Sequence, residues 1–414
     1  MPPPEPLKQR EFAIEVVQAL QQAGFEACFA GGCVRDQLLG REPKDYDIAT
    51  SARPEEVRIL FGHRRTLPIG VSFGVITVRG PRGAGQLDVA TFRSDGKYSD
   101  GRHPDEVHFS SAEEDAQRRD FTINGMFLDP VTERVIDYVG GQEDLARGVV
   151  RAIGAAEVRF ADDKLRMLRA IRFAATLAYE LEADTAAAIT HMADQLTAVS
   201  SERITAEMQR MLVDPHRLRA LRLLRETGLA EVVFAGINLR NEAAWDLALR
   251  TADRLAAPGF ALALAAVLGE LSDAKTAGKL GQKWRLSNEV LRRLTWLVSH
   301  RGDLSGAAGR LWSRLQPLLI HPGAADLVAL CAARAEIGQF ESADVDFCRQ
   351  RLAWPAERLD PPQLISGDDL LARGVPQGSV YRELLSAVRD AQLQGDICTP
   401  SEAFELVDRL LRSR

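Results

Sequence analysis

Two short segments near the N-terminus constrain the chain more than any other part of it. They read Gly31-Gly32-Cys33-Val34-Arg35-Asp36 and Lys44-Asp45-Tyr46-Asp47-Ile48-Ala49. Residues i and i+2 of a β-strand point to the same face, so Asp45 and Asp47 would present two carboxylates to one pair of divalent cations. Magnesium prefers carboxylates together with phosphate oxygens, and glycines let a turn aim N–H groups at a triphosphate. The pattern therefore indicates a nucleotide-handling site in an α/β unit.

Each segment alone has a simpler interpretation. A glycine pair is usually a turn, and Asp-x-Asp is usually a solvated strand face. Here both occur in a strand–turn–helix–strand context, because Phe29-Ala30 ends an apolar segment, residues 34–39 have a helical pattern and residues 46–49 have a strand pattern. The combination favours the functional interpretation.

The pattern of the chain changes near its first third. Residues 1–150 predict a mixed α/β head with a sheet of about five strands, and from Ala155 onward helical patterns dominate. The helix expected first in the head is 11–23. The strands expected in the head are 27–30, 45–49, 74–79, 87–92 and 135–138. The helices expected next are 185–196, 201–212 and 218–227.

Composition excludes several classes of protein. The 414 residues include five cysteines without a CxxC pair, which supports neither a zinc knuckle nor a disulfide framework. No run of 18 or more apolar residues predicts a membrane helix, and the Met1-Pro2-Pro3-Pro4 start does not resemble a signal peptide. A cytoplasmic protein with reduced thiols is expected. The net charge of −6 argues against non-specific coating of nucleic acid but allows a local basic track.

Two further segments carry clustered charge. Arg118-Arg119-Asp120 and Asn124 follow an acidic helix expected at 112–117, and arginine is suited to bidentate phosphate contact, although adjacent arginines are often simply solvated. The segment 160–173 is expected to be one helix, on which Asp163, Arg166, Arg169 and Arg172 recur every three residues and so lie side by side. Ordinary i, i+3 ion pairs are the alternative there.

These segments together resemble the class II tRNA nucleotidyltransferases, the family of CCA-adding enzymes and bacterial poly(A) polymerases. The matching stretches are GGCVRDQLLG, KDYDIATSARPEEV, RRDFTINGM, DDKLRMLRAIRFAA, SERITAEMQRML and LISGDDLLARGVPQGSVYRELL, in family order. The resemblance implies a polymerase-β-like head followed by an all-α neck, body and tail in an elongated, seahorse-like shape. The implied bounds are head 1–150, neck 151–215, body 216–354 and tail 355–414.

The resemblance also implies roles for single residues. Asp45 and Asp47 would be the catalytic ligands of Mg²⁺, with Asp88 as a further carboxylate. The implied nucleotide-binding residues are Gly31, Gly32, Arg35, Arg119, Asp120, Asp163, Arg166, Arg169 and Arg172. The family's neck motif usually begins with glutamate, whereas this chain has Asp162, which puts the bracing of Arg166 in doubt.

Asp163 and Arg166 suit a particular choice of base. An aspartate accepts and an arginine donates hydrogen bonds. Cytosine and adenine each present an amino donor beside a ring-nitrogen acceptor, whereas uracil and guanine present the reverse order. The pair would thus accept C and A without a nucleic-acid template.

The resemblance leaves several activities open. The expected activity is addition of C, C and A to the tRNA 3′ end from CTP and ATP, by attack of the terminal 3′-hydroxyl on the α-phosphate with release of pyrophosphate. Poly(A) synthesis and A-only addition are alternatives. An intact loop at 93–104 disfavours CC-only addition, and intact Asp45 and Asp47 disfavour a non-catalytic RNA-binding relative.

The implied partners are the tRNA 3′ end, CTP and ATP, with no membrane, and no oligomeric state is predicted. A local excess of arginine over residues 201–225 could track RNA phosphates, with a solvated helical face as the alternative.

Overall fold

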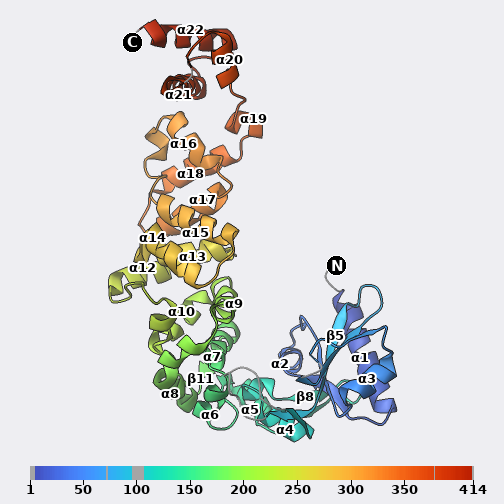
Figure 1. Ribbon diagram of the computed structural model, residues 1–414. Coiled ribbons are helices and arrows are strands. Elements are labelled where there is room, and N and C mark those ends of the chain that lie inside the picture. The colour runs from blue at the N-terminus through green and yellow to red at the C-terminus, as the bar shows by residue number, and fades with distance from the viewer. Residues whose placement is uncertain (1–4, 71–72, 96–106, 377, 413–414) are drawn as a thin grey trace. The chain divides into compact units, whose positions relative to one another are not determined.

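The structure is a computed structural model that describes residues 5–70, 73–95, 107–376 and 378–412 (Figure 1). The chain divides into two compact units, Met1–Ala235 and Gly236–Arg414. The predicted fold class, an α/β head followed by helices, is confirmed. The four domain bounds given above remain a prediction.

The first unit begins with a seven-stranded mixed sheet in the order β3-β4-β5-β2-β1-β8-β9. Its strands are β1 (Ala27–Ala30), β2 (Asp47–Thr50), β3 (Thr66–Leu67), β4 (Val75–Arg79), β5 (Gln86–Thr91), β8 (Phe127–Asp129) and β9 (Arg134–Ile136). Strands β2 and β5 pair in parallel, and the other neighbours are antiparallel. The five expected strands are present, whereas β3 and β8 were missed because two or three residues are too few to show an alternating pattern.

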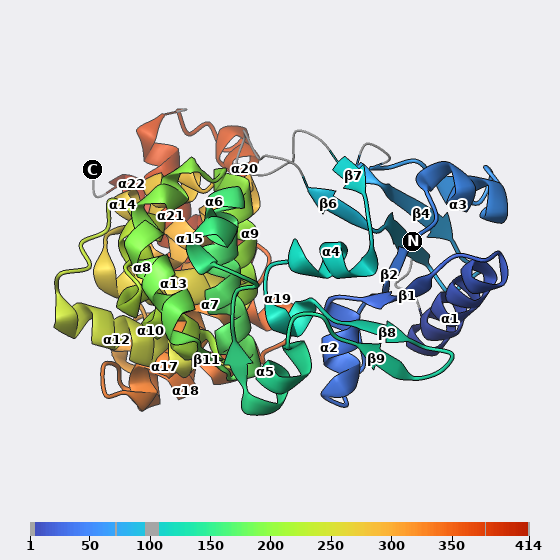
Figure 2. The same ribbon diagram turned by 90° about the horizontal axis from the view of Figure 1, so that it is seen from below.

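Helices cover both faces of the central strands. The head helices are α1 (Pro6–Gln22), α2 (Gly32–Leu38), α3 (Pro54–Phe61) and α4 (Ala112–Gln117). Alternation along β1 turns Phe29 to one face and Cys28 and Ala30 to the other. Figure 2 shows α1 and α4 on opposite sides of β1 and β2.

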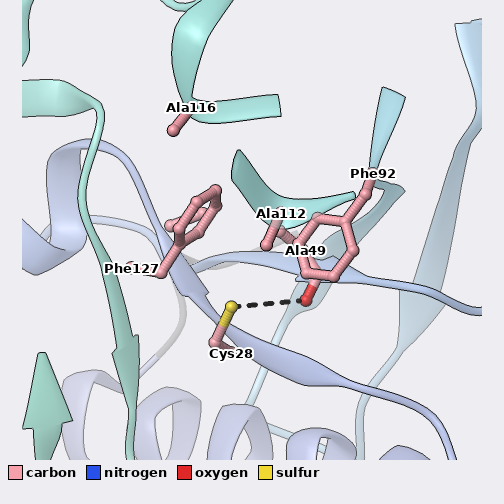
Figure 3. Close-up of a cluster of buried hydrophobic side chains, with 7 residues drawn as sticks. Cys28, Ala49, Phe92, Ala112, Ala116 and Phe127 are labelled. Atoms are coloured by element: carbon pink, nitrogen blue, oxygen red, sulfur yellow. Dashed lines mark hydrogen bonds between the residues drawn. The ribbon is translucent and has the colours of Figure 1, made fainter. Parts of the chain in front are cut away.

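Small side chains let α4 pack closely on its face of the sheet. Cys28, Ala30 and Ala49 face Ala112 and Ala116 of the helix, and all five are buried. The rings of Phe92 and Phe127 lie beside them in an edge-to-face contact with centroids 5.8 Å apart (Figure 3). This core fixes α4, and with it the chain that follows α4, against the strand that begins at Asp47.

The remaining elements of the first unit are helices joined by short turns. They are η2 (Thr122–Asn124), α5 (Gly141–Arg147), α6 (Ala156–Asp162), α7 (Leu165–Leu177), α8 (Ala183–Met192), η3 (Ala193–Ala198), α9 (Ser201–Leu212), α10 (Arg217–Glu226) and α11 (Leu229–Val233). Two short strands, β10 (Val149–Val150) and β11 (Glu180–Leu181), pair in parallel. The helix expected at 201–212 is confirmed, and the one expected at 185–196 ends as a 3₁₀ segment.

The segment predicted as a loop at 93–104 begins as a β-ribbon. Strand β6 (Arg93–Asp95) pairs antiparallel with β7 (Val107–Phe109). Residues 96–104 of that segment lie outside the described residues.

The second unit consists of helices among its described residues. They are α12 (Glu242–Asp253), α13 (Phe260–Leu271), α14 (Ala274–Lys283), α15 (Asn288–His300), η4 (Ala307–Gly309), α16 (Trp312–Leu319), α17 (Ala324–Glu336), α18 (Ser342–Leu352), α19 (Ala356–Leu359), α20 (Gly367–Ala372), α21 (Ser379–Gln394) and α22 (Pro400–Arg412). Side chains of Asn241, Asp273 and Ser287 cap the helices that follow them. Helices α20 to α22 share a small core that includes Leu370, Leu384 and Val407.

Across the described parts of the chain, no single helix has the length and apolarity needed to cross a membrane. One sharply bent pair, α16 with α17, meets those criteria by length and composition when the two are taken together.

Candidate active site

The acidic residues lie where β2 begins. Asp47 is the first residue of β2 and stands in register with Asp88 on the parallel strand β5. Thr77 donates a hydrogen bond of 2.6 Å to Asp88, which orients that carboxylate. The expectation that Asp45 and Asp47 share one strand is wrong, because Asp45 lies in a bend before the strand. Both carboxylates nevertheless face the same cavity.

The surroundings of Asp47 make its negative charge unfavourable. Burial and the charges of Asp45 and Asp88 outweigh the lowering effect of Arg119, and together they raise the pKa of Asp47 to about 6. A carboxylate that resists ionisation beside two others is stabilised in its charged form by a cation. The group therefore suits a divalent ion.

A glycine turn approaches the acidic residues from the next strand of the sheet. Gly31 has φ +73°, a conformation that favours glycine, and it connects β1 to α2. A Cβ atom at Gly31 would lie 3.1 Å from Nη1 of Arg119, so a side chain there would displace that guanidinium. The turn thus leaves room for a basic side chain beside the carboxylates.

Arg118 and Arg119 are held by one buried carboxylate. Asp115 is 1% exposed and accepts hydrogen bonds from Nη2 of Arg118 at 2.7 Å and of Arg119 at 2.9 Å. Burial alone would raise the pKa of Asp115, but the two guanidinium groups outweigh it and lower that pKa. Asp115 also accepts from the backbone N–H of Arg93, where the ribbon of β6 and β7 begins. Both arginines are therefore fixed in direction before any ligand binds.

A hydrogen-bonded chain connects the head to α7. Arg35 donates to Asn124 at 2.8 Å, and Asn124 donates to Asp120 at 3.2 Å. Asp120 accepts from Nη2 of Arg169 at 2.6 Å and from its Nε at 2.9 Å. Burial would raise the pKa of Asp120, but Arg169 outweighs it and lowers that pKa to about 2. The predicted nucleotide-binding residues Arg35, Asp120 and Arg169 thus form one network.

The single helix expected over 160–173 is wrong. Helix α6 ends at Asp162, Asp163 is extended with φ −148° and ψ 105°, and α7 begins at Leu165. The carboxylate of Asp163 accepts the N–H of Leu165 at 3.0 Å, and this hydrogen bond starts the new helix. Asp163 therefore precedes Arg166 in a break between helices and is not on the same helical face.

Arg166 is braced chiefly by backbone oxygens. Its Nη1 donates to the carbonyl of Arg159 at 2.9 Å, and its Nη2 donates to that of Arg118 at 3.4 Å. Asp162 contributes a longer contact of 3.5 Å. The shorter side chain of Asp162 therefore leaves Arg166 anchored by the two carbonyls.

The end of the cavity nearest α9 is strongly basic. The guanidinium carbons of Arg35, Arg169 and Arg172 lie 5.2, 5.3 and 4.1 Å from the ring centroid of Phe173. Arg172 donates to the buried Glu207 at 2.6 Å. Burial and the charge of Arg169 together outweigh Glu207 and lower the pKa of Arg172. Such crowding of cations favours the binding of an anion.

One open cavity of about 1060 Å³ joins these groups within the first unit. Every predicted site residue except Asp88 belongs to its described wall. The wall also contains residues that we did not predict as site residues: Asp36, Arg41, Glu42, Lys44, Arg118, Asn124, Phe173, Thr176, Leu177, Arg210, Val213, Asp214 and Pro215. Arg41 and Lys44 could have been predicted, because they are charged and lie within four residues of Asp45 in sequence. Val213 to Pro215 reach the cavity through tertiary packing, which has no local sequence signal.

The expected basic track over 201–225 is largely neutralised. Arg203 pairs with Asp163, Arg210 with Glu207, Arg219 with Glu180 and Arg225 with Glu231, and the buried Arg217 donates to the carbonyl of Leu212. Arg222 is exposed. The excess positive charge that this stretch presents to solvent is therefore smaller than its arginine content suggests.

We expect Asp120→Asn to lower the free energy of unfolding by about 2 kcal/mol at pH 7, because the pKa of the parent carboxyl falls from 3.8 to about 2 on folding. A carboxyl group whose pKa is lowered on folding stabilises the folded state at pH values above its unfolded pKa. The difference in the free energy of unfolding between Asp120→Asn and the parent should therefore shrink below pH 4 and vanish near pH 2. Urea unfolding at several pH values measures it.

The control for that measurement is Asp360→Asn. It breaks the half-exposed pair with Arg389 and should cost less than about 1 kcal/mol. Equal stability of Asp120→Asn and the parent at pH 7 would contradict the inferred contribution of the buried pair.

The sheet, the acidic residues at the start of β2 and the glycine turn beside them define a nucleotidyltransferase. Residues 27–151 match the poly(A) polymerase head domain, and residues 178–239 match the probable RNA- and SrmB-binding site of polymerase A. The chain is 34% identical over 398 residues to the CCA-adding enzyme of Geobacillus kaustophilus, an alignment that covers 94% of this chain and 93% of the relative. The chain belongs to the family of CCA-adding enzymes and bacterial poly(A) polymerases.

Other relatives and solved structures agree with this assignment. The CCA-adding enzyme of Leuconostoc mesenteroides is 32% identical over 399 residues, which covers 94% of each chain. The crystal structure of the Bacillus stearothermophilus CCA-adding enzyme in complex with CTP superposes with a TM-score of 0.80 at 31% identity and covers 98% of both chains. The Thermotoga maritima enzyme, at 19% identity and a TM-score of 0.69, shows the same fold.

Proposed function

We propose that this chain adds C, C and A to the 3′ end of tRNA from CTP and ATP and releases pyrophosphate. One observation carries the proposal: the carboxylates of Asp45 and Asp47, which we propose as metal ligands, line the same cavity as Asp163 and Arg166, which we propose to read the base. Family membership and the CTP complex of the Bacillus stearothermophilus relative support it.

We propose Mg²⁺ as the divalent ion, held by Asp45 and Asp47. Among the described residues there is no group of three or more His, Cys, Asp or Glu arranged to hold a metal. The two carboxylates of Asp45 and Asp47 fit Mg²⁺, which is commonly bound by one or two carboxylates and by phosphate oxygens of the substrate. When bound, the ion would favour the deprotonated 3′-hydroxyl and neutralise charge on the phosphates. Asp88 lies beside this site and raises its negative charge.

The chain's basic residues would orient the triphosphate. Arg119 is fixed by Asp115 next to the glycine turn, and Arg35 is fixed by Asp36 and Asn124. Arginine binds phosphate oxygens in a bidentate fashion, and preset donors cost little entropy on binding. The α-phosphate would thus be held near Asp45 and Asp47.

Asp163 and Arg166, at the start of α7, would select the base. Asp163 would accept a hydrogen bond from the amino group of C or A, and Arg166 would donate one to the neighbouring ring nitrogen. A mismatched base leaves both groups unpaired, and each unpaired group costs roughly 1–3 kcal/mol. Two mismatches reject U and G by about 10²-fold or more.

We place the protein in the cytoplasm. All five cysteines are free thiols, and four of them are buried, which suits a reducing compartment.

Mg²⁺ binding to the nucleotide-free protein should weaken about tenfold per pH unit below about pH 6, because the ion requires the ionised form of Asp47. Above pH 6 the affinity should be flat. Calorimetric titration with MgCl₂ between pH 5 and 8 measures this dependence. The same steep loss of affinity in Asp47→Asn would show that another group controls it.

The proposal is tested by product length. The protein is incubated with MgCl₂, CTP and ATP and a tRNA transcript that ends at the discriminator base. Addition of three nucleotides, C, C and A, is expected. A long run of A would instead indicate a poly(A) polymerase, and a single A on a transcript ending in CC, with no C addition, would indicate an A-only enzyme.

A further inference from the structure

We propose that Arg203, a residue outside the cavity wall as far as it is described, positions Asp163 and thereby sets the choice of base. The inference rests on the proposed function, because it concerns how that site distinguishes C from U. Arg203 lies on the first turn of α9, forty residues from its partner in sequence.

The contact between the two side chains is bidentate. Nη1 of Arg203 lies 3.1 Å from Oδ1 of Asp163, and Nη2 lies 2.7 Å from Oδ2. Both side chains are mostly buried, with 22% of Arg203 and 14% of Asp163 exposed. A fork-to-carboxylate pair fixes the plane of the carboxylate as well as its position. Arg203 therefore determines the direction in which Asp163 can accept a further hydrogen bond.

The remaining acceptor capacity of Asp163 is small. A carboxylate offers about four acceptor positions. Oδ1 accepts from Arg203 and from the backbone N–H of Leu165, whereas Oδ2 accepts from Arg203. With three positions used, one is left on Oδ2. The base-reading carboxylate thus presents one directed acceptor, which suits the single exocyclic amino group of C or A.

The backbone at Asp163 needs this support. Asp163 is extended between α6 and α7, so no helical hydrogen-bond pattern fixes it. Without Arg203, the side chain of Asp163 would keep its hydrogen bond to the N–H of Leu165, but its carboxylate could rotate about the Cβ–Cγ bond. A rotating carboxylate can also accept from the ring N–H of uracil, so selectivity would fall before binding is lost.

Helix α9 makes a second ion pair one turn later, in which α9 supplies the carboxylate and α7 the guanidinium. Glu207, which is 2% exposed, accepts from Nε of Arg172 at 2.6 Å and from Arg210 at 2.9 Å. Residues 203 and 207 lie on the same face of a helix. One face of α9 therefore holds Asp163, just before α7, and Arg172, in the second half of α7. This arrangement makes α9 a rigid support for the wall that reads the base.

The experiment compares Arg203→Gln and Arg203→Lys with the parent. The readout is the ratio of kcat/KM for CTP and UTP in single-nucleotide addition to a tRNA that ends at the discriminator base. Arg203→Gln should lower the C-to-U ratio about tenfold, which corresponds to one lost directed hydrogen bond. Arg203→Lys keeps the charge but not the fork, so its ratio should lie between those of Arg203→Gln and the parent.

Arg293→Gln is the matched control. It breaks an ion pair of 2.9 Å with Asp326 at similar arginine exposure in the second unit, and its C-to-U ratio should equal that of the parent. Variants of Arg203 that lose CTP and UTP incorporation equally, with an unchanged ratio, would overturn the inference and leave a purely structural ion pair. A parent that adds no C at all would instead overturn the proposed function, and the inference with it.

Discussion

Replacing Asp47 by asparagine should abolish nucleotide addition while raising the melting temperature of the protein. Loss of a metal ligand removes several kcal/mol of transition-state stabilisation, or at least about 10³-fold in rate. Burial and the neighbouring carboxylates raise the pKa of Asp47 to about 6, so the folded parent carries an unfavourable charge at pH 7.5 that asparagine lacks. Product formation on tRNA and thermal melts measure the two effects.

The stability gained in Asp47→Asn should depend on pH, because folding raises the pKa of Asp47. A carboxyl whose pKa rises from 3.8 to about 6 on folding destabilises the folded state above pH 6. The melting advantage of Asp47→Asn should therefore be complete above pH 6 and should vanish near pH 4. Asp253→Asn neutralises an exposed carboxylate of the second unit and should change neither activity nor melting. Near-normal addition by Asp47→Asn would refute the assignment of the metal site.

Replacing Arg166 by alanine should lower addition of both C and A by about 10²-fold or more. Its guanidinium would donate to the ring nitrogen of either base, and it also spans the carbonyls of Arg159 and Arg118. Asp163→Asn should behave differently, because its amide can donate to the carbonyl of uracil. Here the C-to-U ratio should fall by about ten- to a hundredfold, with a smaller loss of total incorporation.

Single-turnover incorporation of each nucleotide separates the two outcomes. Asp369→Asn, which changes a helix-capping carboxylate in the second unit, serves as the control for Asp163→Asn. If Arg166→Ala and Asp163→Asn lost all activity in parallel, with no change in base preference, selection by these protein groups would be ruled out.

Much of the fold could be predicted from local sequence patterns. The bounds of β1, α4 and α9 agree with their expected ranges. A short, fully buried apolar run indicates β1, the cap at Ser111 marks the start of α4, and an amphipathic pattern delimits α9. Strand β3 was missed because two residues carry no period. Its place at the sheet edge depends on pairing with β4, which a local pattern cannot indicate.

The candidate site was predicted less completely, because its geometry depends on distant partners. The register that places Asp88 beside Asp47 joins residues far apart in sequence. The break at Asp163 was missed because the regular spacing of Arg166, Arg169 and Arg172 suggested one uninterrupted helix. Arg203 was assigned to a basic track, since nothing near it in sequence indicates that its charge is balanced by Asp163.

The most direct test of the account is nucleotide binding to the protein alone. Calorimetric titration with CTP, ATP, UTP and GTP, without RNA and with CaCl₂ in place of MgCl₂ to suppress chemistry, asks whether the cavity itself selects the base. The account predicts that CTP and ATP bind and that UTP and GTP bind at least about 10²-fold more weakly. Equal affinity for all four nucleotides would contradict it.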